Sequence, residues 1–374
     1  LFAFGTRGNG YGQLSYPVSI ETDHRGRVYV LNKTTGNITV YTPTEFADLV
    51  HEANQLYSQG KYEESKVIWE QVIEKSNYYT LALVNIGNIL MREEENDAAI
   101  EYFYEAENAL YASEAFEEIR ADFLREHFST IFIVVVVLLI AWVVWGSVKR
   151  ARRRKYGPPK ERHNVFTVIR NFFRRITGIM RHPIDGFEGI RYENQGSYAD
   201  MVIIMILYAL ISVVSEYAVS FIYRDGTPLD VIEPVSTFFF AFLPWIVVCV
   251  VNYGVTTIMY GEGRFRDVII GGAYCHGPLL LLTLPLSLLT HILTQNEAGI
   301  YSIVRILLYF WTVLLVYFCI KGVHGFHPVK AFVVSILTVL GVAAVAILFF
   351  IVYGLAAQMF DFIIQFGKEL SYLV

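Results

Sequence analysis

A run of 21 residues without a charged side chain, residues 128–148, constrains this chain more than any other feature. As an α-helix this run is long enough to cross the ~30 Å hydrocarbon core of a bilayer. Seven Lys or Arg residues follow within a dozen positions, starting at Lys149. Such residues close to a span are retained on the cytoplasmic side. The pattern predicts a transmembrane helix that ends in the cytoplasm, with the preceding part of the chain outside.

Five further apolar segments follow, at residues 201–223, 235–260, 268–294, 302–320 and 331–353. Their connections alternate in charge: "RDGTPLDVIEP" is mainly acidic and "QNEAG" has no cation, whereas "GEGRFRD" and "KGVHGFHPVK" each carry two cations. The positive-inside rule then predicts six spans, with the N-terminal domain and the C-terminus both outside. The composition agrees, because only 17% of residues are charged against about 25% in a soluble domain.

Residues 45–126 are acidic and show a helical repeat. They hold 19 acidic and 6 basic residues, a net charge of −13. A shift of 34 residues aligns one set of small, turn and large positions with a second set, which is typical of tetratricopeptide (TPR) repeats. The first set is Ala53, Leu56, Gly60, Tyr62, Ser65 and Trp69, and the second is Gly87, Leu90, Glu94, Asn96, Ala99 and Phe103. The second copy lacks the turn Gly and Tyr, so a plain pair of helical hairpins stays open as an alternative.

The segment before this repeat predicts short strands. "LFAFG", "VSIETD", "RVYVLN" and "GNITVY" alternate in polarity around glycine-rich turns, including an Asp-x-x-Gly turn. The stretch "FGTRGNGYGQLSYPVSIETDHRGRVYVLNKTTGNITVY" resembles one blade of an NHL-repeat β-propeller. A single blade cannot bury its faces, because propellers need about four to eight blades. The chain also does not begin with Met, so we expect further residues upstream.

Residues 164–181, "NVFTVIRNFFRRITGIMR", combine apolar residues at helical spacing with several arginines. A basic amphipathic helix so close to a span is expected to lie in the inner membrane interface and to attract anionic lipid through Arg170, Arg174 and Arg175. The alternative is a helix packed against other cytoplasmic protein.

The second half of the chain resembles the Yip-type five-helix membrane domain over about residues 181–353. The resemblance rests on "HPIDGFEGIRYENQGSYADM", "GEGRFRDVIIGGAYCHGPLLLLTLP" and "KGVHGFHPVKAFVVSILTVLG". Eukaryotic members are linked to vesicle traffic and small GTPases. The propeller, TPR and Yip-type order is similar to that of bacterial proteins encoded beside carbohydrate ABC importers. The resemblance therefore implies an accessory subunit with an importer permease, an ATPase and a solute-binding protein as partners.

Polar groups within the spans are candidates for function, because leaving them unpaired in lipid is costly. They are Glu216, Asn252, His276, His291 and Arg305. Glu216 and Arg305 can form an intramembrane pair, or each can snorkel to the outer surface. His276, close to Pro278, can line a cavity or bond a backbone carbonyl.

Signatures of catalysis and of metal binding are missing. We find no Ser/His/Asp set, phosphate-binding loop or HExxH motif, and therefore expect neither enzymatic activity nor a cofactor. "HGFH" lacks a nearby carboxylate or Cys to complete a metal site. The three cysteines lie singly in apolar runs, which favours buried thiols. A membrane-tethered basic cluster without a nucleic-acid-binding fold predicts contact with lipid rather than nucleic acid.

The sequence thus predicts a mainly α, polytopic protein of a bacterial cytoplasmic membrane. Its predicted parts are a propeller-like blade (residues 1–44), two TPR-like hairpins (45–126), a transmembrane helix (127–148), a basic cytoplasmic linker with an interfacial helix (149–182) and a Yip-type five-helix domain (183–374). We expect a non-catalytic accessory or scaffold protein whose outer module docks a partner, with Tyr62, Trp69 and Phe103 as contact residues. The alternative is a small-solute or ion transporter, whose cavity Glu216, Asn252, His276 and Arg305 would line together.

Overall fold

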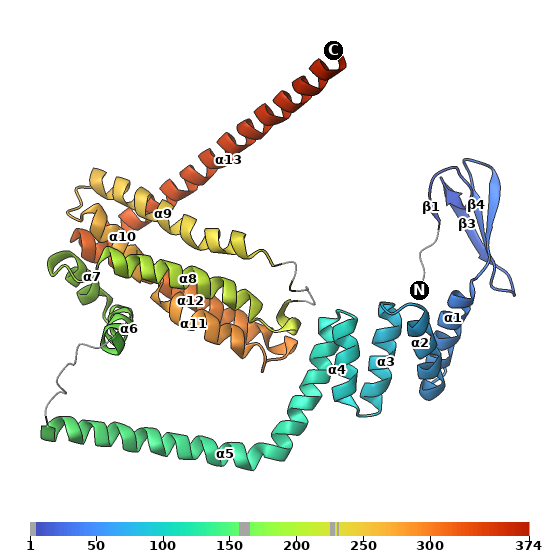
Figure 1. The fold of residues 1–374 in the computed structure, drawn as a ribbon, viewed down its shortest axis with the longest axis horizontal. Coiled ribbons are helices and arrows are strands. Elements are labelled where there is room, and N and C mark those ends of the chain that lie inside the picture. The colour runs from blue at the N-terminus through green and yellow to red at the C-terminus, as the bar shows by residue number, and fades with distance from the viewer. Residues whose placement is uncertain (1–4, 157–164, 225–228, 230–231, 374) are drawn as a thin grey trace. The chain divides into compact units, whose positions relative to one another are not determined.

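The computed structural model describes residues 5–156, 165–224, 229 and 232–373. The chain forms two compact units. Unit 1 comprises Leu1–Val144 and Phe221–Pro228, and unit 2 comprises Trp145–Ser220 and Leu229–Val374. Figure 1 shows strands and helical hairpins in the first unit and a bundle of helices in the second.

Unit 1 begins with a three-stranded antiparallel sheet in the order β3 (Pro17–Thr22), β4 (Val28–Asn32) and β5 (Asn37–Tyr41). The predicted Asp-x-x-Gly turn joins β3 to β4. Its Asp23 Oδ1 accepts hydrogen bonds from the backbone N–H groups of Arg25 at 2.9 Å and Arg27 at 3.0 Å. The three strands were therefore predicted correctly, whereas most of "LFAFG" lies outside the described residues.

The glycine-rich connection before the sheet holds a small parallel pair, β1 (Thr6–Arg7) and β2 (Gln13–Leu14), that the sequence did not predict. Within the three-stranded sheet only Val30 is a buried apolar residue, while Ile20 and Ile38 are about 60% exposed. This sheet does not bury its own faces, and a propeller remains a prediction.

Four helices follow as two antiparallel hairpins: α1 (Glu45–Ser58) with α2 (Tyr62–Lys75), and α3 (Thr80–Arg92) with α4 (Asn96–Glu105). Their geometry repeats at the predicted 34-residue shift. Ala53 and Gly87 are the small residues at the crossings: Ser65 Oγ donates to Ala53 O at 2.7 Å, and a Cβ on Gly87 would lie 2.5 Å from the Phe103 ring.

The two hairpin turns have the same backbone structure. Gly60 (φ 79°) and Glu94 (φ 64°) are both left-handed. The next amide donates back to the helix in each turn, from Lys61 N to Leu56 O at 3.0 Å and from Glu95 N to Leu90 O at 2.9 Å. This six-to-one bond is characteristic of a Schellman helix end. The second turn therefore forms without the glycine that the first turn has.

A short 3-10 helix, η1 (Phe221–Arg224), packs within unit 1 although it follows the first helix of the membrane bundle in sequence. Ile222 is 4% exposed and belongs to the core of the hairpins. The ring of Phe221 meets that of Tyr104 edge-on at 5.0 Å. Burial raises the pKa of Tyr104 above its usual value.

The predicted first span lies within one continuous 48-residue helix, α5 (Ala109–Tyr156). Its apolar stretch has none of its residues buried by other parts of the described chain. The acidic segment 114–126 belongs to the same helix, as the sequence indicated.

Unit 2 contains α6 (Val165–Arg181), α7 (Pro183–Tyr192), α8 (Tyr198–Tyr217), α9 (Pro234–Ile258), α10 (Phe265–Tyr274), α11 (Gly277–Leu289), the short 3-10 helix η3 (Gln295–Glu297), α12 (Ala298–His324) and α13 (Pro328–Leu373). Six segments of the described chain are long and apolar enough to cross a membrane: the five predicted in this unit and the stretch in α5. The core of unit 2 brings together residues of α6 to α12, and Tyr274 is fully buried in it.

The segment predicted as one span at 268–294 is two helices, α10 and α11, separated at Cys275 and His276. Pro278 explains the break, because proline has no N–H and its ring clashes with the carbonyl four residues earlier, here that of Tyr274. The backbone tightens at this point, and His276 N–H bonds to Ala273 O at 3.1 Å.

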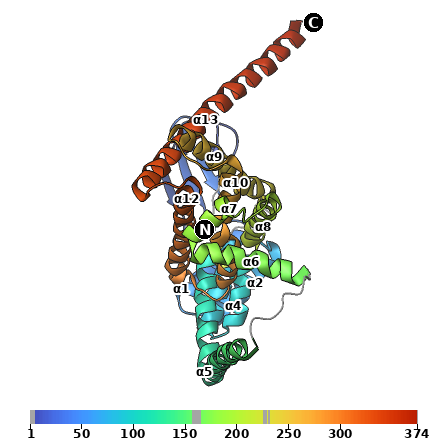
Figure 2. The ribbon, with the colours of Figure 1, turned by 90° about the vertical axis from the view of Figure 1, so that its left-hand side faces the viewer.

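The last helix, α13, packs only through its first part. Ala331, Val334 and Thr338 are buried, and α13 contacts α9 and α12. From Ala343 on, the described side chains are mostly exposed. In Figures 1 and 2 this part extends beyond the other helices of unit 2.

Candidate functional site

The four polar residues predicted to line one cavity lie at two separate cavities. Glu216 and Arg305 line the first, which we call the charged cavity. Asn252 and His276 line the second, which we call the thiol cavity. The expectation that all four residues line one transport cavity is therefore wrong for this conformation.

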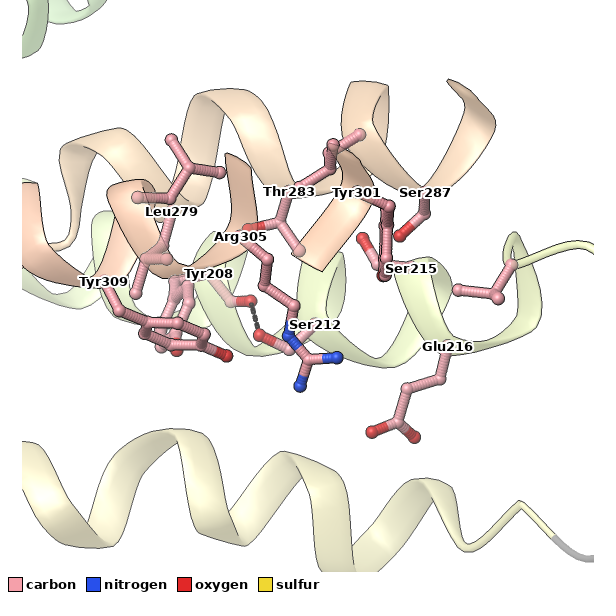
Figure 3. A pocket seen from close by; sticks show the side chains of 13 residues that line it. Tyr208, Ser212, Ser215, Glu216, Leu279, Thr283, Ser287, Tyr301, Arg305 and Tyr309 are labelled. Atoms are coloured by element: carbon pink, nitrogen blue, oxygen red, sulfur yellow. Dashed lines mark hydrogen bonds between the residues drawn. The ribbon is translucent and has the colours of Figure 1, made fainter. Parts of the chain in front are cut away.

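The charged cavity has a volume of about 160 Å³ and lies between α8, α11 and α12 (Figure 3). All three helices contribute polar side chains to it. The polar lining residues are Tyr208, Ser212, Ser215, Glu216, Thr283, Ser287, Tyr301, Arg305 and Tyr309.

Glu216 and Arg305 share this cavity, but no ion pair within 4.0 Å joins these two described side chains. The carboxylate oxygen Oε2 of Glu216 instead accepts a hydrogen bond from Thr237 Oγ1 of α9 at 2.8 Å. The guanidinium of Arg305 lies 6.0 Å from the ring centroid of Tyr309, within reach of a cation–π interaction. The cavity therefore holds a cation and an anion that do not neutralise each other by direct contact.

Ser215 is a buried polar residue of this cavity. It is 3% exposed, and its Oγ has no hydrogen-bond partner in the described structure. Ser212, about one helical turn before Ser215 on α8, donates from its Oγ to Tyr208 O at 2.9 Å (Figure 3). An unpaired buried hydroxyl costs free energy, so Ser215 is a site where a ligand or water is expected to bond.

The thiol cavity, of about 150 Å³, brings all three cysteines of the chain to one place. Cys249 comes from α9, Cys275 from the break between α10 and α11, and Cys319 from α12, and all three are buried free thiols. Their burial was predicted from their apolar surroundings. Their convergence was not, because residues on three helices carry no common spacing in the sequence.

Asn252 and His276 are both satisfied within the bundle. Asn252 Nδ2 donates to Thr338 Oγ1 at 3.0 Å, which ties α9 to α13. His276 Nδ1 lies 3.0 Å from Gly272 O, as the backbone-carbonyl interpretation of this histidine requires. The ring of His276 also packs against Tyr208 at 4.9 Å, so these two rings lie between the two cavities.

With this geometry established, comparison with protein families gives one match, the Yip1 domain, over residues 177–365. The chain belongs to the Yip1 family. This is a family of membrane proteins, and the chain is a multi-pass membrane protein by the length and composition of its helices. Neither curated proteins nor solved structures give a match.

The Yip1 domain begins inside α6, and the structure divides the three arginines predicted to contact lipid. Arg170 and Arg174 are exposed, whereas Arg175 Nη1 pairs with Asp200 Oδ2 at 2.7 Å and with Tyr274 Oη at 3.4 Å. Partial burial lowers the pKa of Arg175, but the hydrogen bonds that it donates to Tyr274 and Asp200 raise this pKa overall.

The two halves of α6 lie in different surroundings, one packed against protein and one exposed. Ile176 and Ile179 are buried in the bundle core, while Val168, Ile169 and Phe173 are exposed. The C-terminal half of α6 thus packs against protein, and its N-terminal half keeps an uncovered apolar face beside Arg170 and Arg174.

The aromatic residues predicted to contact a partner through the hairpins have a different position. Trp69 and Phe103 are fully buried and belong to the core of the two hairpins, where the Phe103 ring fills the space beside Gly87. Tyr62 is half-buried, and its ring lies 4.7 Å below the guanidinium of Arg92. A partner of this unit would therefore contact other side chains.

His291 and His324 lie near helix ends of the bundle. His291 Nε2 lies 3.0 Å from Ala218 O. His324 of the "HGFH" motif is buried, and its Nδ1 accepts a hydrogen bond from Gly263 N–H at 3.2 Å. Among the described residues, no group of three or more His, Cys, Asp or Glu side chains has an arrangement that could hold a metal ion.

Proposed function

We propose that the protein is a non-catalytic membrane scaffold whose bundle packs against other membrane subunits through α13. The observation that carries this proposal is a face of small residues on α13 that points away from the bundle. With 100° per residue, Ala343, Ala346, Gly354 and Ala357 lie within about 80° of one another. Small residues on one face let transmembrane helices approach closely.

The opposite side of α13 makes its contacts within the chain. Ala331, Val334 and Thr338 are buried there, and a Cβ on Gly341 would lie 2.6 Å from Val251 of α9. A Cβ on Gly354, in contrast, would meet nothing within 4 Å. Glycine in a helix interior costs about 0.8–1 kcal/mol relative to alanine, and no contact within the described chain explains this cost. A neighbouring helix would.

We propose that unit 1 docks a partner on the extracytoplasmic side of a bacterial cytoplasmic membrane, with the basic linker in the cytoplasm. The packing of η1 in unit 1 supports this, since the acidic connection after α8 is predicted to lie outside. A cleft of about 370 Å³ between the second hairpin turn and α5 supports docking of a basic segment. The carboxylates of Glu94, Glu118 and Asp122 line it together with the guanidinium of Arg125. Arg125 pairs with Asp122 at 2.8 Å, which leaves a net negative charge for a basic segment.

The partners that we propose are the permease and ATPase subunits of a carbohydrate ABC importer, together with its solute-binding protein. The experiment is purification of the full chain from its native membrane in mild detergent, followed by mass spectrometry. Stoichiometric permease and ATPase subunits support this assignment. A chain that purifies alone under conditions that keep other membrane complexes intact contradicts the scaffold role.

A transporter or channel is the second candidate, and one observation favours it. The break between α10 and α11 places His276 at an interrupted helix beside a cavity, an arrangement that transporters use for binding sites. The division of the polar residues into two cavities weighs against a continuous path. Uptake of sugars or ions into vesicles that contain only this chain would support the second candidate, and Tyr208→Ala would then be expected to change the rate.

A further inference from the structure

The charged cavity carries two opposite charges at one end of the bundle. Glu216 is the residue before the last of α8, and Arg305 lies seven residues into α12. The 27 residues of α12 span about 40 Å at 1.5 Å per residue, or about 10 Å more than the hydrocarbon core. Arg305 is therefore close to the boundary between hydrocarbon and headgroups, and Glu216 lies at the same end.

Arg305 has the properties of an anion-binding group. Its side chain is exposed on the bundle surface, no carboxylate lies within 4.0 Å among the described ion pairs, and Tyr301 and Tyr309 line the cavity beside it. A guanidinium can bind a phosphate through two parallel hydrogen bonds. In Figure 3 its charged end projects in the same direction as the carboxylate of Glu216.

Glu216 provides acceptors for a cation. The bond from Thr237 to Glu216 Oε2 fixes the carboxylate, which has acceptor capacity for about four bonds. A primary ammonium donates up to three hydrogen bonds, whereas a trimethylammonium donates none.

We propose that the charged cavity binds a phosphoethanolamine group, with its phosphate on Arg305 and its ammonium on Glu216. At the membrane surface, the source of this group is the headgroup of phosphatidylethanolamine. The cavity volume of about 160 Å³ is several times the ~30 Å³ that one water molecule occupies in the liquid. This binding site is distinct from the small-residue face of α13 and does not depend on the scaffold role.

The test is native mass spectrometry of the full, delipidated chain titrated with phosphatidylethanolamine, phosphatidylcholine or phosphatidylglycerol. We expect phosphatidylethanolamine to bind about tenfold more tightly than the other two, a difference of about 1.4 kcal/mol. Arg305→Gln should remove this tight binding. Glu216→Gln should reduce phosphatidylethanolamine to the level of phosphatidylcholine, because it removes the acceptor that distinguishes the two headgroups.

Arg170→Gln is the matched control, since it removes an exposed arginine outside the cavity and should leave the preference unchanged. Equal binding of the three lipids by the native chain overturns the proposal, as does a preference that survives both cavity variants. If Arg305→Gln does not yield a monodisperse protein, a photoreactive phosphatidylethanolamine on the native chain replaces it. Its cross-links must fall on α8, α11 or α12, and cross-links confined to other helices reject the site.

Soluble phosphoethanolamine, added as a competitor, distinguishes the two sources of the ligand. Competition only at concentrations far above those of the lipid identifies the membrane lipid as the ligand. Competition at equal concentration supports the same site chemistry and assigns it to a soluble phosphoethanolamine compound instead.

Discussion

The second hairpin turn should become more stable when Glu94 is replaced by glycine. Glu94 adopts φ 64° where its equivalent in the first turn, Gly60, adopts φ 79°. A left-handed conformation costs an L-residue about 1–2 kcal/mol. Glycine removes this strain but destabilises the fold by about 0.4–1 kcal/mol, because it raises the entropy of the unfolded chain. The expected net gain for Glu94→Gly is about 0.5–1 kcal/mol, and Gly60→Ala should lose about 0.5–1 kcal/mol by the same reasoning.

Amide hydrogen exchange of the full chain in detergent measures both changes, because it reports local opening. The reporters are the amides that close the two turns, Glu95 N–H and Lys61 N–H. Exchange of Glu95 should slow by about two- to fivefold in Glu94→Gly, and exchange of Lys61 should quicken by about two- to fivefold in Gly60→Ala.

Glu94→Ala is the control for charge, because Glu94 lines a cleft with two other carboxylates. Alanine removes the negative charge but keeps the strained conformation, so it should leave the exchange of Glu95 nearly unchanged. If alanine protects this amide as well as glycine does, charge repulsion explains the effect and the conformational reasoning is refuted.

Three further predictions concern contacts between helices. Asn252→Leu should cost about 0.6–1.7 kcal/mol, the range for hydrogen bonds between membrane helices, seen as a lower thermal unfolding midpoint in detergent; an unchanged midpoint would show that its bond to Thr338 does not matter. Gly272→Ala should destabilise the packing of α9 on α10, because its Cβ would lie 2.7 Å from Cys249 Sγ; labelling of Cys249 by a thiol reagent should become faster, and slower labelling would contradict this. The hydrogen bond from Lys75 lowers the pKa of Glu45, so its contribution to hairpin stability is present above the usual pKa near 4.5 and is lost as the pH falls through the lowered value. Exchange of α1 amides should show this acid dependence in the native chain but not in Glu45→Gln, and equal profiles would exclude the ion pair as its cause.

The sequence predicted the features that depend on local pattern. Apolar runs long enough to cross a bilayer located all six membrane segments, and the 34-residue shift located both hairpins, including the crossing residues Ala53 and Gly87. These features were predictable because a helix that must bury a face, or remain in lipid, repeats that requirement along its own residues.

Other features depend on tertiary structure and could not be read from spacing. Cys249, Cys275 and Cys319 meet in one cavity although they lie on separate elements. Glu216 and Arg305 share a cavity, as an intramembrane pair would, yet Glu216 bonds to Thr237 instead. Trp69 and Phe103 were predicted to contact a partner, but both are buried in the core of the hairpins. The break in the 268–294 segment had a signal in Pro278, which the hydropathy pattern obscured.

The scaffold role is tested most directly by the small-residue face of α13. We would purify the full chain carrying Gly354→Leu, Ala357→Leu or Ala356→Leu from native membranes and compare the co-purified membrane subunits with those of the native chain. Ala356 is the matched control, because it is rotated by about 100° from Ala357 and lies outside the small-residue face. The account predicts that Gly354→Leu and Ala357→Leu lose the partner subunits while Ala356→Leu retains them. Equal retention by all three variants would contradict it.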